Sequence, residues 1–423
     1  MGVTVAVTRV ACNTSTGTQD ITTTDLGGLT PKAALFVVTK ATSDGSAATH
    51  AVLGMGATDG TNQWAIGNMA RDAQSSTQCA RRAMTDECVM IMVDTGPSVD
   101  GEAAFSSWIT NGVRIDWGDA PAAAYLLTVV FFAGTDLSVD VGTFTFASTV
   151  NTDTDVTSVG FEADAVLFAS HANPINDTGY TSFFASFGIA LNSSPVRQYS
   201  AAITDRHAQA TTNINGLTSD DYAISILYNG SNYLAGEIGS FDASGFSCTT
   251  RVNNGGGEQI GYLALSFGGA VDFEAGVVAT PTSTGNQSIT DPGFTPQAVL
   301  LGLSRCATLD TVETDQLDAG VFGISVFDED DEYCNSTQSE AGVGTSDTQS
   351  LSDDSVVNLP EGDGTAGHVA SFVSFDANGW TWNFSTTDTG SARQWWYFAV
   401  EEEAAAGGLS IPVAMRCYRN RRV

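Results

Sequence analysis

The stretch GFTPQAVLL at residues 293–301 decides the fold, because the same pattern occurs three times in this chain. The other copies are GLTPKAALF at residues 28–36 and GFEADAVLF at residues 160–168. Their first glycines are 132 and 133 residues apart. In each copy a glycine precedes a short apolar run, which is typical of a turn that leads into a buried β-strand. A repeat at a fixed period predicts an architecture built from copies of one unit.

A second landmark recurs at the same period near the end of each copy. Its turn glycines, Gly112, Gly245 and Gly379, are 133 and 134 residues apart. Apolar and polar residues alternate on both sides, which indicates antiparallel strands joined by a hairpin. We expect these glycines to supply the positive φ that a short hairpin loop needs. The three segments are ITNGV at 109–113, FDASGF at 241–246 and FDANGW at 375–380.

A nearly continuous apolar run closes each copy, and such short runs fit central strands of a sandwich better than helices. These runs are residues 125–132, 262–267 and 395–400. The sequence therefore predicts an all-β protein with three tandem antiparallel β-sandwich domains and a short C-terminal arm. The predicted boundaries are 1–135, 136–269, 270–403 and 404–423. We also expect the domains to form a stiff rod, and allow a short helix within residues 65–82.

The charge balance is strongly acidic, with 48 Asp and Glu residues against 16 Lys and Arg residues and a formal net charge of −32. This argues against nucleic-acid binding by the body of the protein, since that function needs a cationic face. It keeps the protein soluble and self-repelling. An acidic, lysine-poor composition is also favoured in a very salty medium, so a halophilic setting is a hypothesis.

The seven cysteines show no framework that repeats across the three copies. An odd number without such symmetry argues against a disulfide scaffold. We expect mainly reduced, buried cysteines, although Cys79 with Cys88 and Cys306 with Cys334 remain possible pairs. The first residues lack a basic and apolar leader pattern, and no apolar run of about 18 residues occurs. We therefore expect synthesis in a cytoplasm without a signal peptide, and no membrane partner.

The last twenty residues differ from the rest of the chain. An Ala/Gly linker at residues 404–408 leads to a short apolar segment and then to four arginines within residues 416–423. One interpretation is a disordered basic tail. The other is a docking arm whose apolar side chains add to a partner while the arginines bind its carboxylates. The proposed docking residues are Ile411, Val413, Met415, Arg416, Tyr418, Arg419, Arg421 and Arg422.

No residue set in the sequence has the pattern of a catalytic, cofactor or metal site. His50, His171, His207 and His368 lack metal-ligand spacing and are interpreted as surface or turn residues. The acidic run at residues 328–332 could attract calcium, but a solvated hairpin tip explains it better. Asp116 and Asp119 flank an aromatic residue as glycosidase carboxylates can, and a surface turn explains them better.

Four tryptophans gather in the last hairpin and closing strand of the third copy. Exposed tryptophan rings can form a platform for sugars, whereas tryptophans that alternate in phase with the core pack inside it. We favour core packing and keep glycan contact as an alternative. The residues are Trp380, Trp382, Trp395 and Trp396.

Residues 293–301, the hairpin at 375–380 and the Arg/Tyr-rich ending at 415–422 resemble structural proteins of tailed viruses, especially marine or halophilic ones. In that family, repeated β-sandwich domains build head decorations, fibres or tail appendages. The resemblance implies no catalytic or binding residues for this chain.

The resemblance implies a non-enzymatic structural protein on the virion exterior, held to the major capsid protein or another virion protein by its C-terminal arm. It also implies a symmetric homo-oligomer, with trimers or pentamers as plausible forms. The alternative is a receptor-binding tail fibre or lectin-like adhesin that recognises host-surface glycans. A third hypothesis, a polysaccharide-degrading enzyme, needs a carboxylate pair in a cleft.

Overall fold

The computed structural model of the chain describes residues 2–93, 96–229, 233–252, 257–314, 320–360, 366–388 and 390–402. The described part is all-β and antiparallel, as the sequence predicts, and its one helical element is the three-residue 3-10 turn η1 (Thr24–Leu26). The helix allowed within residues 65–82 is a wrong prediction. Parts of this segment belong to two strands that pair antiparallel in one sheet.

The first eleven strands, which we call unit one, follow the segment order that recurs later in the chain. They are β1 (Thr4–Ala11), β2 (Gly17–Thr22), β3 (Pro31–Thr39), β4 (Ala48–Thr49), β5 (Ala51–Thr58), β6 (Gln63–Ala70), β7 (Cys79–Met84), β8 (Val89–Met92), β9 (Val99–Ile109), β10 (Gly112–Asp119) and β11 (Leu126–Ala133).

The next eleven strands form unit two. They are β12 (Ser138–Thr145), β13 (Asp153–Val156), β14 (Ala165–Ser170), β15 (Tyr180–Thr181), β16 (Phe183–Leu191), β17 (Arg197–Asp205), β18 (Ile214–Ser219), β19 (Ile224–Leu227), β20 (Tyr233–Asp242), β21 (Gly245–Val252) and β22 (Gln259–Ser266).

The last eleven strands form unit three. They are β23 (Phe273–Ala279), β24 (Gly285–Ile289), β25 (Pro296–Ser304), β26 (Glu313–Thr314), β27 (Gly320–Asp328), β28 (Glu332–Ser339), β29 (Thr348–Asp353), β30 (Val357–Pro360), β31 (Ala366–Asp376), β32 (Gly379–Thr386) and β33 (Gln394–Glu401).

Each unit is a sandwich of a seven-stranded and a four-stranded sheet. In unit one the orders are β1-β11-β3-β5-β6-β7-β15 and β2-β10-β9-β8. The corresponding strands of units two and three follow the same orders. The apolar runs expected to close each copy are β11, β22 and β33, and each has a strand on both sides. Between the two sheets of every unit lies a separate apolar core.

The glycines that open the three landmark stretches occupy the same place in their units. Gly28, Gly160 and Gly293 have φ of 90°, 79° and 76°, which L side chains rarely adopt. Each donates its backbone N–H to the hairpin that forms the second landmark, so the two landmarks meet. The acceptors are Asn111 Oδ1 at 2.6 Å, Ser244 O at 3.0 Å and Asn378 O at 3.0 Å.

The hairpin glycines Gly112, Gly245 and Gly379 are required for a reason that the sequence did not reveal. Positive φ in the turn of unit one belongs to Asn111, at 64°. A Cβ on any of the three glycines would lie within 2 Å of a carbonyl oxygen on the neighbouring strand β2, β13 or β24. The glycine therefore allows two backbones to approach closely. The predicted positive φ is found at Gly245 and Gly379, at 158° in both, and is wrong for Gly112.

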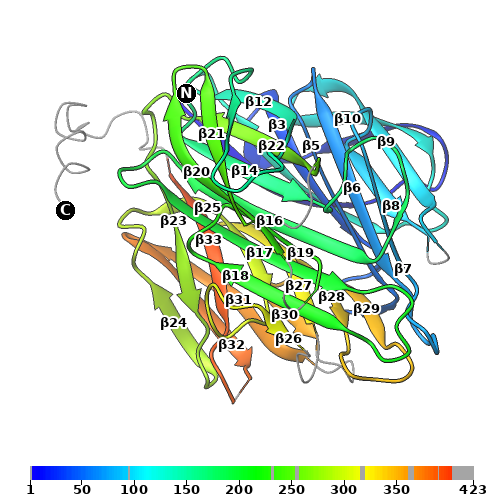
Figure 1. Ribbon diagram of the computed structural model, residues 1–423. Helices are drawn as coiled ribbons and strands as arrows, with labels where there is room; N and C mark the ends of the chain where they lie inside the picture. The colour runs from blue at the N-terminus through cyan, green and yellow to red at the C-terminus, as the bar shows by residue number, and fades with distance from the viewer. Residues whose placement is uncertain are drawn as a thin grey trace.

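The three units close into a ring, and the predicted rod is wrong. The two-residue strand β15 of unit two extends the seven-stranded sheet of unit one by pairing with β7. In the same way β26 of unit three pairs with β18 of unit two, and β4 of unit one pairs with β29 of unit three. Figure 1 shows the three groups of strands packed against one another instead of end to end. This cyclic exchange covers one edge of every large sheet.

A central apolar core lies where the three large sheets face one another. It contains the equivalent residues Leu35, Leu167 and Leu300, one from each unit. Each seven-stranded sheet is therefore buried on both faces, against its own small sheet and against the other units. This explains why strands such as β5, β16 and β27 are buried along their whole length.

The hairpin loops after β6, β17 and β28 interlock in the same cyclic order. One residue of each loop, Ala73, Ala208 or Gly342, has φ of 58°, 58° or 76°. Its backbone N–H donates to a carbonyl of the loop in the previous unit. These bonds are Ala73 to Ser346 at 2.7 Å, Ala208 to Thr77 at 2.8 Å and Gly342 to Thr212 at 3.0 Å. The repeated geometry indicates a pseudo-three-fold arrangement within one chain.

Candidate functional site

We name the contacts between units seam one–two, seam two–three and seam three–one. At each seam a left-handed residue of one unit donates its backbone N–H to the last large-sheet strand of the previous unit. These residues are Asp177 in seam one–two, Asp310 in seam two–three and Gly45 in seam three–one. Their φ values are 60°, 55° and 68°. The backbone of the chain is therefore nearly the same at all three positions.

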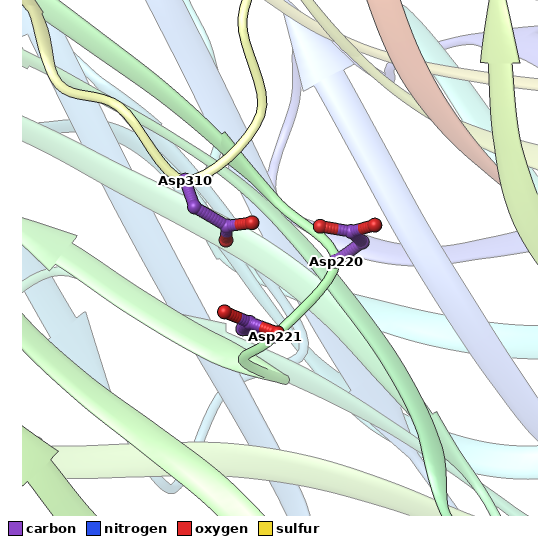
Figure 2. A group of neighbouring side chains, drawn as sticks. All are labelled: Asp220, Asp221 and Asp310. Carbon is purple, nitrogen blue, oxygen red and sulfur yellow. The ribbon is translucent and has the colours of Figure 1, made fainter.

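Seam two–three brings three carboxylates together at this position. Asp220 and Asp221 lie in the turn between β18 and β19, and Asp310 lies in the loop before β26. One carboxylate oxygen from each lies within 4.8 Å of the others, and all three residues are exposed. Figure 2 shows the three side chains around a common space. We call this group the aspartate trio.

Hydrogen bonds and mutual repulsion set the protonation of the aspartate trio. Ser219 Oγ donates to Asp310 Oδ1 at 2.6 Å. A hydrogen bond with Asp310 raises the pKa of Asp220 to about 6, with burial and the negative charges of Asp310 and Asp221 adding to it. Burial and then the charges of Asp310 and Glu237 also raise the pKa of Asp221. The group is thus arranged to share a proton or to accept a cation that neutralises it.

The chemistry of these ligands favours a hard cation such as Ca²⁺, which takes carboxylate oxygens. At the equivalent place in seam one–two, Arg82 neutralises the carboxylate of Asp177 by pairing with it at 2.6 Å. Sequence reasoning missed the aspartate trio because Asp310 lies some 90 residues after Asp220 and Asp221. One signal is present in the sequence: Asp310 follows Asp177 by 133 residues, which is the period of the repeat.

The four tryptophans predicted as core or glycan residues are core residues. Trp380, Trp382, Trp395 and Trp396 are each 0% exposed, so none offers a ring face to a sugar. The indole N–H groups of Trp382 and Trp395 donate inside the unit, to Gln287 Oε1 at 3.1 Å and to Ser304 O at 2.7 Å. The glycan alternative for these residues is therefore wrong, because Trp380, Trp382 and Trp395 lie in the core between the sheets of unit three and Trp396 lies in the central core.

Two of the four histidines lie in the interior, contrary to the surface interpretation. Burial lowers the pKa of His171 to about 3 and that of His368 to about 4, so both are neutral. His50 and His207 follow the predicted turn role, and each accepts a backbone N–H through Nδ1, from Asp72 at 2.9 Å and from Cys79 at 3.1 Å.

Cys79, His207 and Asp205 lie together and resemble a nucleophile with its base, but their geometry opposes that role. Burial, followed by the charge of Asp205, raises the pKa of the Cys79 thiol well above its usual value. His207 Nδ1 already accepts the Cys79 backbone N–H. A nucleophilic cysteine needs a lowered pKa and a base at its sulfur. The six described cysteines are buried and free, as predicted for them; Cys417 lies outside the described residues.

The acidic run at residues 328–332 forms the hairpin tip between β27 and β28, as the favoured interpretation predicts. Asp328 accepts the backbone N–H groups of Asp330 at 3.1 Å and Asp331 at 2.9 Å, and that of Val7 across seam three–one at 3.1 Å. Its oxygens are thus occupied by the chain itself. Asp116 and Asp119 lie exposed on β10, on either side of the buried Trp117.

One further groove lies at seam one–two, with a volume of about 480 Å³. Its lining includes Trp108 and Lys32 of unit one and Phe161 of unit two. Trp108 is half-buried, whereas the other six tryptophans of the chain are buried. The predicted docking arm at residues 404–423 lies outside the described residues. Within the described part, no helix has the length and apolar character to cross a membrane.

No protein-family model matches the sequence, and no curated protein matches it. Among solved structures, a fructofuranosidase from Schwanniomyces occidentalis complexed with fructose is 9% identical, with 93% of this chain and 98% of that chain covered. The TM-score is 0.14. A likeness at that level carries no argument about the fold or the activity of this chain.

Proposed function

We propose that this chain is a non-enzymatic structural protein of a virus particle surface, anchored to the particle by its C-terminal arm. The observation that carries the proposal is the closed ring of three similar sandwiches within one chain. Such a ring offers a pseudo-three-fold body whose large sheets are covered at both faces. Capsid surfaces present local three-fold positions, and a single chain of this form can occupy one of them without partners of its own kind.

The place where the arm begins supports anchoring at one end of the ring. Glu402 donates its backbone N–H to Thr295 O at 2.8 Å, beside the start of β25. Gln297 Nε2 donates to Glu401 O at 2.7 Å and to Val3 O at 3.3 Å. The described part of the chain therefore ends next to the first strand, and we expect the arginines of the arm that follows to bind acidic groups of a particle.

The test is to find the protein in purified particles and to remove the arm. The full chain is expected on the particle surface, and a chain that ends at residue 403 is expected to stay folded and free in solution. Circular dichroism and mass measurement check the fold of the truncated chain. Normal incorporation of the truncated chain would contradict anchoring by the arm, and absence of the protein from particles would contradict the whole proposal.

A second candidate function is binding of host-surface glycans, and the groove beside Trp108 favours it. The ring of Trp108 lies over the β5–β6 turn, where a Cβ on Gly60 would come within 2.4 Å of the indole nitrogen. An accessible tryptophan beside charged side chains is a suitable surface for a sugar ring. Glycan-array binding that is lost with Trp108→Ala but kept with Phe241→Ala, the equivalent position in unit two, would support this function.

A further inference from the structure

Seam three–one contains a buried network of four polar side chains, whose hydroxyl pair recurs in seam two–three as Thr218 with Ser304. Thr39 and Ser352 join their hydroxyls at 2.8 Å, and Ser352 Oγ donates to Asn335 Oδ1 at 3.0 Å. Asn335 Nδ2 donates to Thr128 Oγ1 at 3.0 Å. All four side chains are at most 1% exposed. Units one and three therefore meet through hydroxyl and amide groups at the centre of their contact.

A second set of polar contacts extends this network along β5. Ser350 Oγ accepts the backbone N–H of Val52 at 2.7 Å and donates to His50 O at 2.7 Å. Thr348 Oγ1 donates to Ala70 O at 2.9 Å. The face of β29 that meets unit one thus presents a row of hydroxyls, Thr348, Ser350 and Ser352, at alternate positions.

Aromatic rings fill the corresponding positions of the other two seams. In seam one–two the ring of Trp64 lies on Gly261, where an added Cβ would come within 2.7 Å of it. In seam two–three Trp396 packs on Phe187, with ring centroids 5.3 Å apart. Separating these rings would expose large apolar surfaces to water, which is unfavourable. Separating hydroxyls and amides exchanges their hydrogen bonds for bonds with water, which changes the free energy far less.

Chain connectivity adds to this difference. Residues 134–137 link β11 to β12 across seam one–two, and residues 267–272 link β22 to β23 across seam two–three. Seam three–one has no such link, because units three and one are connected only through unit two. At the other end of this contact, isolated side chains bond to the backbone of the neighbouring unit. Gln297 Oε1, for example, accepts the Val5 N–H at 2.9 Å.

We propose that seam three–one is a gate: the ring opens there reversibly while the other two seams stay closed. Opening separates the hydroxyl row of β29 from β5 and frees β4 from the edge of β29. The three sandwiches keep their own cores during this motion, because those cores lie between the two sheets of each unit. The apolar packing of Trp64 and Trp396 keeps the remaining contacts in place.

Hydrogen exchange on the intact chain tests the gate without any mutation. The N–H groups of Gly45, His50 and Val52 form hydrogen bonds across seam three–one. The equivalent N–H groups across seam one–two are those of Asp177, Ser182 and Phe184. We expect at least tenfold faster exchange for the first set. Equal rates, or slower exchange in the first set, would overturn the proposal.

Two matched disulfides sharpen the test. Thr39→Cys with Ser352→Cys would lock seam three–one, and Ser304→Cys with Thr218→Cys would lock seam two–three, where the same two positions join their hydroxyls at 2.5 Å. The first pair is expected to slow exchange at Gly45, His50 and Val52 at least tenfold in its oxidised form, and the second to leave it unchanged. The opposite pattern would overturn the gate. If either variant fails to fold, the exchange comparison on the intact chain still decides.

Discussion

Seam one–two and seam two–three use the same backbone but carry different charges at their rims. In seam one–two, Asp177 faces Arg82 at 2.6 Å. In seam two–three, Asp310 takes the place of Asp177 and faces Asp220 and Asp221. The left-handed residue donates the same backbone bond in both, to Ala83 O at 2.8 Å and to Thr218 O at 2.9 Å. Backbone hydrogen bonds thus fix the position of the units, and the side chains at the rim are left to vary.

The largest effect is expected from the aromatic centre that both seams share. Trp64→Ala removes a ring that is 1% exposed and the indole donor that lies 3.1 Å from Tyr262 O. Phe187→Ala removes the ring that packs on Trp396 in seam two–three. Large-to-small changes of this kind cost about 3–5 kcal/mol of unfolding free energy. Urea denaturation measures it.

The control for this comparison is Phe161→Ala, which removes a partly buried ring at the groove of seam one–two. It is expected to cost less than either central substitution. A loss below about 1 kcal/mol for Trp64→Ala would contradict the central role of the ring, since such a value is typical of surface changes.

The second prediction concerns the cation that the aspartate trio can hold. Calcium is expected to raise the melting temperature of the intact chain, because a ligand at ten times its Kd adds about 1.4 kcal/mol of stability. Asp310→Asn is expected to remove the effect, whereas Asp177→Asn at the equivalent position of seam one–two is expected to keep it. An equal calcium response in Asp310→Asn would show that the ion binds elsewhere, and isothermal titration would measure its affinity.

Local patterns in the sequence predict the sandwich well but not the closure of the ring. Gly293 and its counterparts in the other two units lie in turns that lead into a strand, and the closing runs are central strands, both as expected. The ring depends on β4, β15 and β26, which have two residues each and no apolar alternation. Their pairing arises from tertiary packing, so a local pattern contains no signal for it.

The candidate site was less accessible to sequence reasoning for the same reason. The positive φ of Asp310 is set by its backbone bond to the neighbouring unit, and nothing in its local sequence indicates it. The repeat period makes Asp310 the equivalent of Asp177, but only the structure of the seams shows what side chains surround this position. The tryptophan cluster shows the converse in part. Alternation along β32 predicts the place of Trp380 and Trp382 in the core, whereas the adjacent Trp395 and Trp396 lie on opposite faces of β33 and are both buried.

The third prediction uses pH to separate the two rims. The raised pKa of Asp220, about 6, means that the folded state holds this proton more tightly than the unfolded state. The stabilisation is complete below the ordinary aspartate pKa of about 3.9 and disappears as the pH rises through about 6. The intact chain is therefore expected to lose stability between about pH 4 and about pH 6.5.

Asp220→Asn is expected to reduce this loss by less than about 1 kcal/mol, since the group is exposed and solvent screens it. Other carboxylates change stability in the same direction. Burial also raises the pKa of Asp205 to about 6, for example. Only the difference between the intact chain and the variant reports on the trio, and identical pH profiles from thermal melts would contradict its raised pKa.

The smallest effect is expected at the rim of seam one–two. The side chains of Arg82 and Asp177 are 24% and 54% exposed, and pairs of this kind contribute about 0.2–1 kcal/mol. Burial raises the pKa of Glu102, and the charge of Arg82 partly counters that rise. Arg82→Ala therefore leaves the carboxylates of Asp177 and Glu102 without this positive charge, as in the aspartate trio. High salt screens repulsion between carboxylates, with a Debye length of about 3 Å at 1 M. Chemical unfolding of Arg82→Ala should therefore show its loss at low salt and recover in 1 M NaCl, whereas a loss that persists in high salt would mean that the arginine acts by packing and not by charge.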